Sequence, residues 1–257
     1  AESVIELKGD LIFLGAAGEE TDSCGAKKFV QDNIRDIPPL AGIVIPEPTD
    51  FEIITAHRGL LWLQICTHGK TAHGSMPQLG INAITAMNRV INELQNYKFR
   101  SPSHKLLGGC SMSINTIKGG NAVNVVPDKC AVEIDFRTIP AEDHSGLIDS
   151  IKNIITRLKQ NDPKFEADVS IVRDTGALET DNNSDFVKNF CSAAEIDRTA
   201  TAGFCTDGPF LASLSKNIVI FGPGKPHLCH KPDEFIDICD VEKAAEFYKK
   251  IIMKFLA

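Results

Sequence analysis

The stretch LLWLQICT at residues 60–67, followed by NAITAMNRVINELQNY at residues 82–97, decides the fold class. The first stretch is apolar and rich in residues that favour strands, which predicts a β-strand. In the second, apolar side chains recur at helical offsets, which predicts an amphipathic helix. Three more strands and one more helix are predicted downstream, at residues 111–117, 129–137 and 165–172 and at residues 144–160. The order strand, helix, strand, strand, helix, strand is typical of the ferredoxin-like βαββαβ unit, a sheet with helices on one face.

The segments on either side of this unit return to mixed α/β patterns. Strands are predicted at residues 11–16, 41–45, 51–55 and 217–221, and helices at residues 23–33, 185–194 and 241–255. The simplest organisation is one α/β domain made from residues 1–57 and 175–257. Residues 58–174 are inserted into it as a second domain.

The composition favours a globular protein and excludes several classes of partner. The chain has 257 residues, 27 Lys and Arg against 34 Asp and Glu, a net charge of −7, and 43% hydrophobic residues. An acidic balance argues against nucleic acid or an anionic membrane as partner. No apolar run approaches the roughly 20 residues that a membrane-spanning helix needs. The eight cysteines are scattered, which predicts reduced thiols in a cytoplasmic protein and disfavours a cysteine-rich zinc site.

Carboxylates follow two of the predicted strands. Glu19 and Glu20 come directly after the strand expected at residues 11–16, and Glu47 stands between two prolines after the strand at 41–45. Ligand sites of α/β sheets lie at the carboxyl ends of strands. Of two adjacent glutamates, one can bind a metal ion while the other serves as general base for a water molecule. Solvated acidic turns are the alternative interpretation of both segments.

Imidazole, guanidinium and amide groups occur in glycine- and proline-rich loops or at strand ends. His230 ends the loop that follows the strand at residues 217–221 and is a candidate metal ligand, with His227 as its rival. His73 could stabilise an oxyanion, and Arg137 could hold a carboxylate. Asn121 offers an amide donor, although turn chemistry explains it equally well.

The motifs occur in one order along the chain. They are Glu19-Glu20, Pro46-Glu-Pro48, His73-x-Ser-x-Pro77, Gly120-Asn-x-x-Asn-x-x-Pro127, Asp135-x-Arg137 and Gly222-Pro-Gly…His230-x-x-Asp-Glu234. With a ferredoxin-like insert, this combination resembles the zinc-dependent family that includes acetylornithine deacetylase, succinyl-diaminopimelate desuccinylase, aminoacylase and bacterial carboxypeptidases. The resemblance covers essentially the whole chain.

The resemblance implies a role for each candidate residue of the catalytic domain. Glu19 matches the general base, and Glu20 and His230 match two ligands of one metal ion. Glu47 matches a ligand of the other ion. Thr206 and Gly208 match a segment beside the substrate pocket. The implied cofactor is Zn²⁺ at two sites, with Co²⁺ or Mn²⁺ as alternatives.

The resemblance also implies that the insert is a dimerisation or lid domain. His73 matches a histidine that reaches the partner subunit's active site in family dimers, and Arg137 and Asn121 match residues that hold the substrate carboxylate. The fold expected is therefore a partial mixed-sheet catalytic domain with a ferredoxin-like dimerisation domain inserted in it. The expected partners are a second copy of the chain and a small N-acyl amino acid or peptide.

This sequence departs from the family pattern in one place. Family members carry a His-x-Asp motif and a further bridging Asp ahead of the Glu-Glu pair, whereas only residues 1–18 precede Glu19 here. We therefore expect that the N-terminal metal ligands are absent and that the isolated chain is inactive. The expected activity is removal of an acetyl or succinyl group from an amino acid by a metal-dependent amidohydrolase. The alternatives are a di- or tripeptidase, a carboxypeptidase, or an inactive truncated product that dimerises through the insert.

Overall fold

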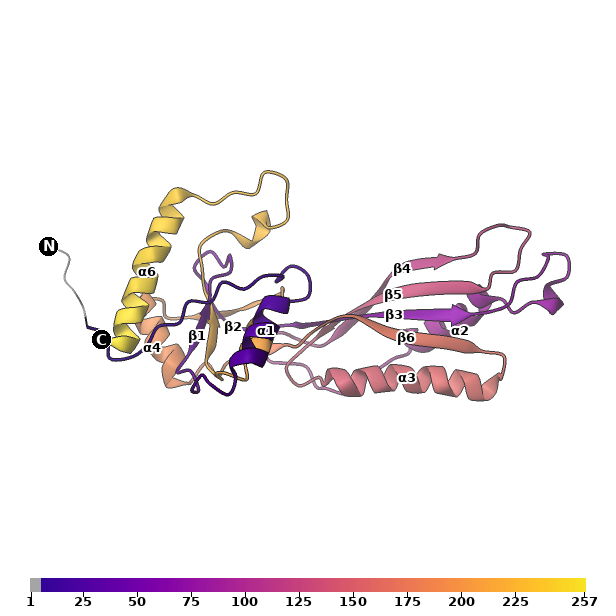
Figure 1. Ribbon diagram of the computed structural model, residues 1–257, viewed down its shortest axis with the longest axis horizontal. Helices are drawn as coiled ribbons and strands as arrows, with labels where there is room; N and C mark the ends of the chain where they lie inside the picture. The colour runs from indigo at the N-terminus through magenta and orange to yellow at the C-terminus, as the bar shows by residue number, and fades with distance from the viewer. Residues whose placement is uncertain (1–5) are drawn as a thin grey trace. The chain divides into compact units, whose positions relative to one another are not determined.

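A computed structural model describes residues 6–257 of the chain, which divides into two compact units (Figure 1). The split unit comprises residues 1–58 and 177–257, and the insert comprises residues 59–176. The sequence placed these boundaries after residues 57 and 174. No helix among the described residues combines the length and the apolar character needed to cross a membrane.

The insert contains one antiparallel sheet of four strands. Its strands are β3 (Gly59–His68), β4 (Ser111–Gly119), β5 (Lys129–Thr138) and β6 (Glu166–Thr175). They lie in the order β4-β5-β3-β6, and every neighbouring pair is antiparallel. Helices α2 (Ala83–Gln95) and α3 (His144–Asn161) connect them and lie against the sheet (Figure 1). This chain order confirms the predicted ferredoxin-like unit.

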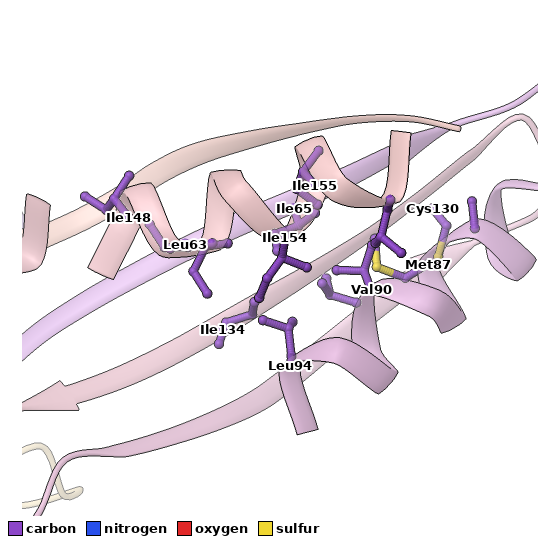
Figure 2. Packing of buried hydrophobic residues seen from close by; sticks show 14 of the residues in the cluster. Leu63, Ile65, Met87, Val90, Leu94, Cys130, Ile134, Ile148, Ile154 and Ile155 are labelled. Atoms are coloured by element: carbon purple, nitrogen blue, oxygen red, sulfur yellow. The ribbon is translucent and has the colours of Figure 1, made fainter. Parts of the chain in front are cut away.

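Alternation along the strands explains why the helices cover one face of this sheet. Leu61, Leu63 and Ile65 of β3 are fully buried and face the helices, whereas Trp62 and Gln64 between them are half-buried on the opposite face. The apolar stripe of α2 meets them, and Figure 2 shows Leu63 and Ile65 in one cluster with side chains of both helices. Such burial contributes roughly 1.5–3 kcal/mol for each large side chain.

Side chains of the sequence fix where both insert helices begin. The Asn82 side chain accepts a hydrogen bond from the backbone N–H of Thr85 at 3.0 Å. The Asp143 carboxylate accepts hydrogen bonds from the N–H groups of Ser145 and Gly146 at the start of α3. These contacts satisfy donors that the first helical turn leaves unpaired.

The split unit has a mixed sheet between two layers of helices. Its strands are β1 (Ile43–Ile45), β2 (Ile53–His57), β7 (Leu178–Glu179), β8 (Thr199–Ala202) and β9 (Ile218–Ile220). β1 is parallel to β9, β2 is antiparallel to β9 and β7, and β2 is parallel to β8. One face packs on α4 (Asp185–Ala194) and α6 (Ile238–Leu256), and the other on α1 (Cys24–Asn33) and α5 (Gly208–Leu211). Two short 3₁₀ helices, η1 (Pro77–Leu79) in the insert and η2 (Pro226–Leu228) in the split unit, lie in loops.

The strand predicted at residues 11–16 is wrong. These residues have no regular secondary structure, and Leu11, Ile12 and Phe13 are 60%, 46% and 95% exposed. A continuously apolar strand needs neighbours and cover on both faces, and no strand among the described residues runs beside this segment. The apolar composition of residues 11–16 therefore predicts a strand, but the described residues provide no partner strand for it.

Candidate active site

Two parallel strands bring Glu47 and the His230 loop to one edge of the split unit's sheet. β1 ends at Ile45 and β9 ends at Ile220, and the two strands pair in register. The Phe221 N–H donates to the Ile45 carbonyl at 2.9 Å, which continues the pairing past the strand ends. The loops that follow therefore leave the sheet side by side.

Gly222 allows these two loops to pack closely. A Cβ atom at this position would lie 2.5 Å from the Glu47 carbonyl oxygen, a distance that real contacts do not show. The Thr49 hydroxyl donates to the Gly222 carbonyl at 3.3 Å and accepts from its N–H at 3.2 Å. The backbone of the Glu47 loop is thus held against the loop that carries His230.

Glu19 and Glu20 lie in a turn that precedes α1. The turn is closed by hydrogen bonds from the N–H groups of Thr21 and Ser23 to the Gly18 carbonyl, at 3.1 and 2.7 Å. Gly18 has a φ of 80°, which favours glycine because it has no Cβ. The two glutamates follow an irregular segment, and the turn itself holds them in place.

The structure places two of the predicted residues, Glu20 and His230, close to each other. Glu20 Oε2 lies 3.8 Å from His230 Nε2, with both side chains largely exposed. Burial raises the pKa of the half-buried Glu47 to about 7, and the carboxylates of Glu19, Glu20 and Asp207 add to the rise. The site therefore combines several like charges that act on one half-buried carboxyl group. A cavity of about 230 Å³ is lined in part by Pro48 and Cys229, the chain neighbours of Glu47 and His230, and by Gly224 and Glu234.

This donor set suits a divalent cation in charge and in atom type. The carboxylates of Glu19, Glu20 and Asp207 all raise the pKa of Glu47, and a cation at Glu47 would relieve that repulsion. Carboxylate oxygen and imidazole nitrogen are both zinc ligands. Within residues 6–257, however, no three His, Cys, Asp or Glu side chains lie close enough to hold one ion. The described residues thus offer atom types that zinc binds, but only the pair Glu20 and His230 lies close together.

A buried histidine fixes the segment around Thr206. His57 is fully buried, and its Nδ1 lies 2.8 Å from the Arg58 carbonyl oxygen, so Nδ1 carries the proton. Its Nε2 then accepts a hydrogen bond from the Thr206 hydroxyl at 3.1 Å, and that hydroxyl accepts from the Gly208 N–H at 3.0 Å. Burial lowers the pKa of His57 to about 4, so the imidazole is neutral at pH 7.

In the insert, two predicted loops lie together. His73 forms an isolated bridge with Val125, and the Gly74 N–H donates to the Asn124 carbonyl at 2.7 Å. The His73 loop therefore contacts the loop that contains Asn121. His73 Nδ1 accepts a hydrogen bond from the Ser75 N–H at 3.2 Å, which leaves Nε2 as the nitrogen that carries the proton.

Arg137 lies at the other end of the same sheet. It pairs with Leu60 and Ser111, whereas the His73 loop follows His68, which pairs with Lys129 at the opposite end of β5. Eight residues of strand separate these ends by about 26 Å. The Arg137 Nε lies 2.9 Å from Asp135 Oδ1. Within one copy of the insert, Arg137 and Asn121 therefore do not share a site.

A family model supplies the decisive comparison. The model of the peptidase dimerisation domain of the M20 type matches residues 55–163. The insert is an M20 peptidase dimerisation domain. The prediction of an inserted dimerisation domain is confirmed.

Curated relatives match nearly the whole chain. Acetylornithine deacetylase of Buchnera aphidicola (subspecies Schizaphis graminum) is 28% identical over 98% of this chain and 66% of its own length. A probable succinyl-diaminopimelate desuccinylase of Staphylococcus epidermidis is 27% identical over 99% of this chain and 71% of its own length. The chain thus spans about two thirds of the length of the relatives it matches.

Solved structures share the fold. Aminopeptidase PepT of Bacillus cereus superposes with a TM-score of 0.73 at 21% identity, over 93% of this chain and 62% of that one. A dinuclear metal-binding peptidase of the M20 family from Bacillus subtilis gives a TM-score of 0.66 at 16% identity, over 91% and 62%. Both resemble the chain across the dimerisation domain and the split unit.

Sequence reasoning missed His57 and Asp207. His57 ends a strand whose five residues are all buried, and a buried histidine in an apolar strand gives little signal without its partner 149 residues away. Asp207 stands between two residues that the family resemblance did single out, Thr206 and Gly208. Its 7% exposure, which no local pattern indicates, sets it apart from an ordinary loop carboxylate.

Proposed function

We propose that this chain is the larger part of a metal-dependent amidohydrolase that removes an acetyl or succinyl group from an amino acid. The observation that carries the proposal is the approach of Glu20 to His230 in the split unit, with Glu19 and Glu20 also acting on Glu47, in a chain that contains an M20 dimerisation domain. The names of the relatives, a deacetylase and a desuccinylase, support this class of substrate.

In this proposal Glu20 and His230 hold one metal ion, Glu47 holds a second, and Glu19 moves the proton. Zinc, when bound, would polarise the acyl carbonyl and acidify water. Glu19 takes a proton from the attacking water and delivers it to the nitrogen of the leaving amino acid. The ions expected are Zn²⁺, with Co²⁺ or Mn²⁺ as substitutes, and the ligand set within the described residues is incomplete.

The insert supplies the remaining groups in the proposal. His73, through its Nε2–H, donates to the oxyanion, and Asn121 and Arg137 hold the carboxylate of the substrate. Since Arg137 lies about 26 Å along β5 from the His73 loop, these groups reach one substrate only if two copies of the chain contribute. We therefore propose a homodimer formed through the dimerisation domain, for which strand β4 offers an edge that no described strand covers. The free thiols suit a cytoplasmic location.

A direct assay tests the activity. The chain is incubated with Zn²⁺ or Co²⁺ and with N-acetylornithine, N-succinyl-diaminopimelate or a dipeptide, and free amine is measured. Release from the acylated amino acids, lost in Glu19→Gln with an unchanged circular dichroism spectrum, supports the proposal. Full turnover by Glu19→Gln would remove Glu19 from its role.

The same assay decides the second candidate, a di- or tripeptidase. The structural likeness to aminopeptidase PepT favours it. Hydrolysis of dipeptides alone would replace the deacylase proposal with this one. Absence of any hydrolysis, together with a dimer in analytical ultracentrifugation, would indicate that this chain serves only assembly.

A further inference from the structure

The least satisfied polar group of the split unit is the carboxylate of Asp207. The residue is only 7% exposed, and its Oδ1 is buried without a hydrogen-bond partner among residues 6–257. A buried charge without a partner is costly, and native proteins rarely keep one. A carboxylate in this position therefore points to a function, either as a direct ligand or through its electrostatic field.

The backbone around Asp207 is held firmly. The neighbouring Thr206 hydroxyl is fixed between His57 Nε2 and the Gly208 N–H. A Cβ atom on Gly208 would lie 2.9 Å from Leu178 Cδ2 and 3.3 Å from Ile45 Cδ1, so this segment packs closely against β7 and the end of β1. The backbone that carries the carboxylate is therefore held in place, and the neutral His57 does not offset its charge.

This charge lies near the candidate active site. Gly208, the residue after Asp207, packs against Ile45 at the end of β1, two residues before Glu47, and Asp207 acts on Glu47 together with Glu19 and Glu20. Because Asp207 is buried, solvent and salt screen its field much less than that of an exposed carboxylate. The site thus has a fixed negative charge besides the groups proposed to hold metal.

We propose that the buried carboxylate of Asp207 makes the candidate site selective for a substrate that carries a positively charged ammonium group. This inference rests on the proposed function, because it concerns the substrate of that same site. A role as metal ligand is the alternative explanation, and Zn²⁺ binding by the Asp207→Asn variant distinguishes the two. An ammonium group needs only favourable potential and a few acceptors. It would come from the side chain of a basic N-acyl amino acid or from the free end of a peptide.

Matched ligand pairs test the selectivity by isothermal titration calorimetry on chelator-treated protein, where no turnover occurs. The first pair is Nα-acetylornithine and Nα-acetylnorvaline, which differ by the side-chain amine. The second pair is alanylalanine and its des-amino analogue propionylalanine. We expect the ammonium-bearing member of one pair to bind about 10-fold or more tightly than its neutral partner. The pair that shows the preference identifies the source of the ammonium group.

Variants then assign the preference to Asp207. In Asp207→Asn the preference disappears while the affinity for the neutral ligand is kept, whereas Asp36→Asn, an exposed aspartate of the same unit, leaves the preference intact. If circular dichroism shows that Asp207→Asn does not fold, Asp207→Ser is measured in the same way. Equal binding of both members in both pairs overturns the inference, as does a preference that survives loss of the carboxylate.

Two further measurements keep the proposals apart. If Asp207→Asn weakens Zn²⁺ binding and leaves the ligand preference unchanged, Asp207 serves the metal and the inference is wrong. A chain that prefers the cationic ligand but never hydrolyses it contradicts the proposed function and leaves the selectivity of Asp207 standing.

Discussion

Substitution of His57 by Gln tests how the split unit depends on its buried histidine. The imidazole is fully buried and neutral, and its two nitrogens are matched to the Arg58 carbonyl and the Thr206 hydroxyl. As pH falls through 6.5, the unfolded chain takes up a proton on His57, but the folded chain does not until about pH 4. The stability that His57 contributes is therefore complete above pH 6.5 and is lost as pH falls toward 4.

The size of this loss follows from the depressed pKa. A shift from 6.5 to about 4, at about 1.4 kcal/mol per unit, gives about 3 kcal/mol. Glu47 has the opposite trend, because its pKa is raised from 4.5 to about 7 and its contribution is lost as pH rises through that window. The contribution of His57 is therefore obtained from the difference in unfolding free energy between the parent and the His57→Gln variant at each pH.

The assay is urea unfolding followed by circular dichroism at pH 7.5, 5.5 and 4.5, on the parent and on His57→Gln. The parent should be the more stable at pH 7.5, and its advantage should shrink by about 2–3 kcal/mol at the lowest pH. His227→Gln, at an exposed histidine of the same unit, should follow the parent throughout. An advantage that stays constant with pH would refute the assignment of a buried, neutral His57.

Three further predictions concern Glu47, Gly222 and the core of the insert. Without metal, Glu47→Gln should raise the unfolding free energy at pH 8 by up to about 3 kcal/mol, because it removes a carboxyl group whose pKa burial raises to about 7. The gain should disappear below pH 4.5, where the carboxyl group is neutral in both states. No gain in a urea titration at pH 8 would argue against a desolvated carboxylate at Glu47. Gly222→Ala should destabilise by about 1–3 kcal/mol, because its Cβ would lie 2.5 Å from the Glu47 carbonyl oxygen, whereas Gly203→Ala, with open space around it, should change the thermal midpoint little. Leu63→Ala should lower the unfolding free energy by about 2–5 kcal/mol, because the side chain is fully buried. Unfolding is followed by the fluorescence of Trp62, the single tryptophan. A loss below about 1 kcal/mol would contradict the packing in Figure 2.

The insert could be predicted from sequence because its signals are local. The helices at 82–97 and 144–160 bury a stripe at helical spacing, and the strands alternate, so each pattern specifies one face without knowledge of the partner. The observed helices, Ala83–Gln95 and His144–Asn161, differ from the predicted ones only at their ends. Its ferredoxin-like order then followed from the order of elements.

The split unit was less predictable because its elements depend on distant partners. The strand expected at residues 11–16 lacks a neighbour in the described residues and is irregular. β7 and β8 are two and four residues long and exist through pairing with β2, which no local period reveals. Likewise, the convergence of Glu20 with His230 was expected from family resemblance, whereas the role of Asp207 required its burial to be seen.

Zinc binding by the Glu47→Gln variant tests the central claim most directly, since that claim makes Glu20, Glu47 and His230 ligands of two neighbouring zinc ions. Affinity is measured by competition with a fluorescent chelator for the parent, for Glu47→Gln and for Glu246→Gln, a distant glutamate of α6 in the same unit. The account predicts Zn²⁺ binding about 10-fold or more weaker in Glu47→Gln and unchanged in Glu246→Gln. Equal affinity in all three proteins would show that Glu47 does not face the cation, and the proposed site would be contradicted.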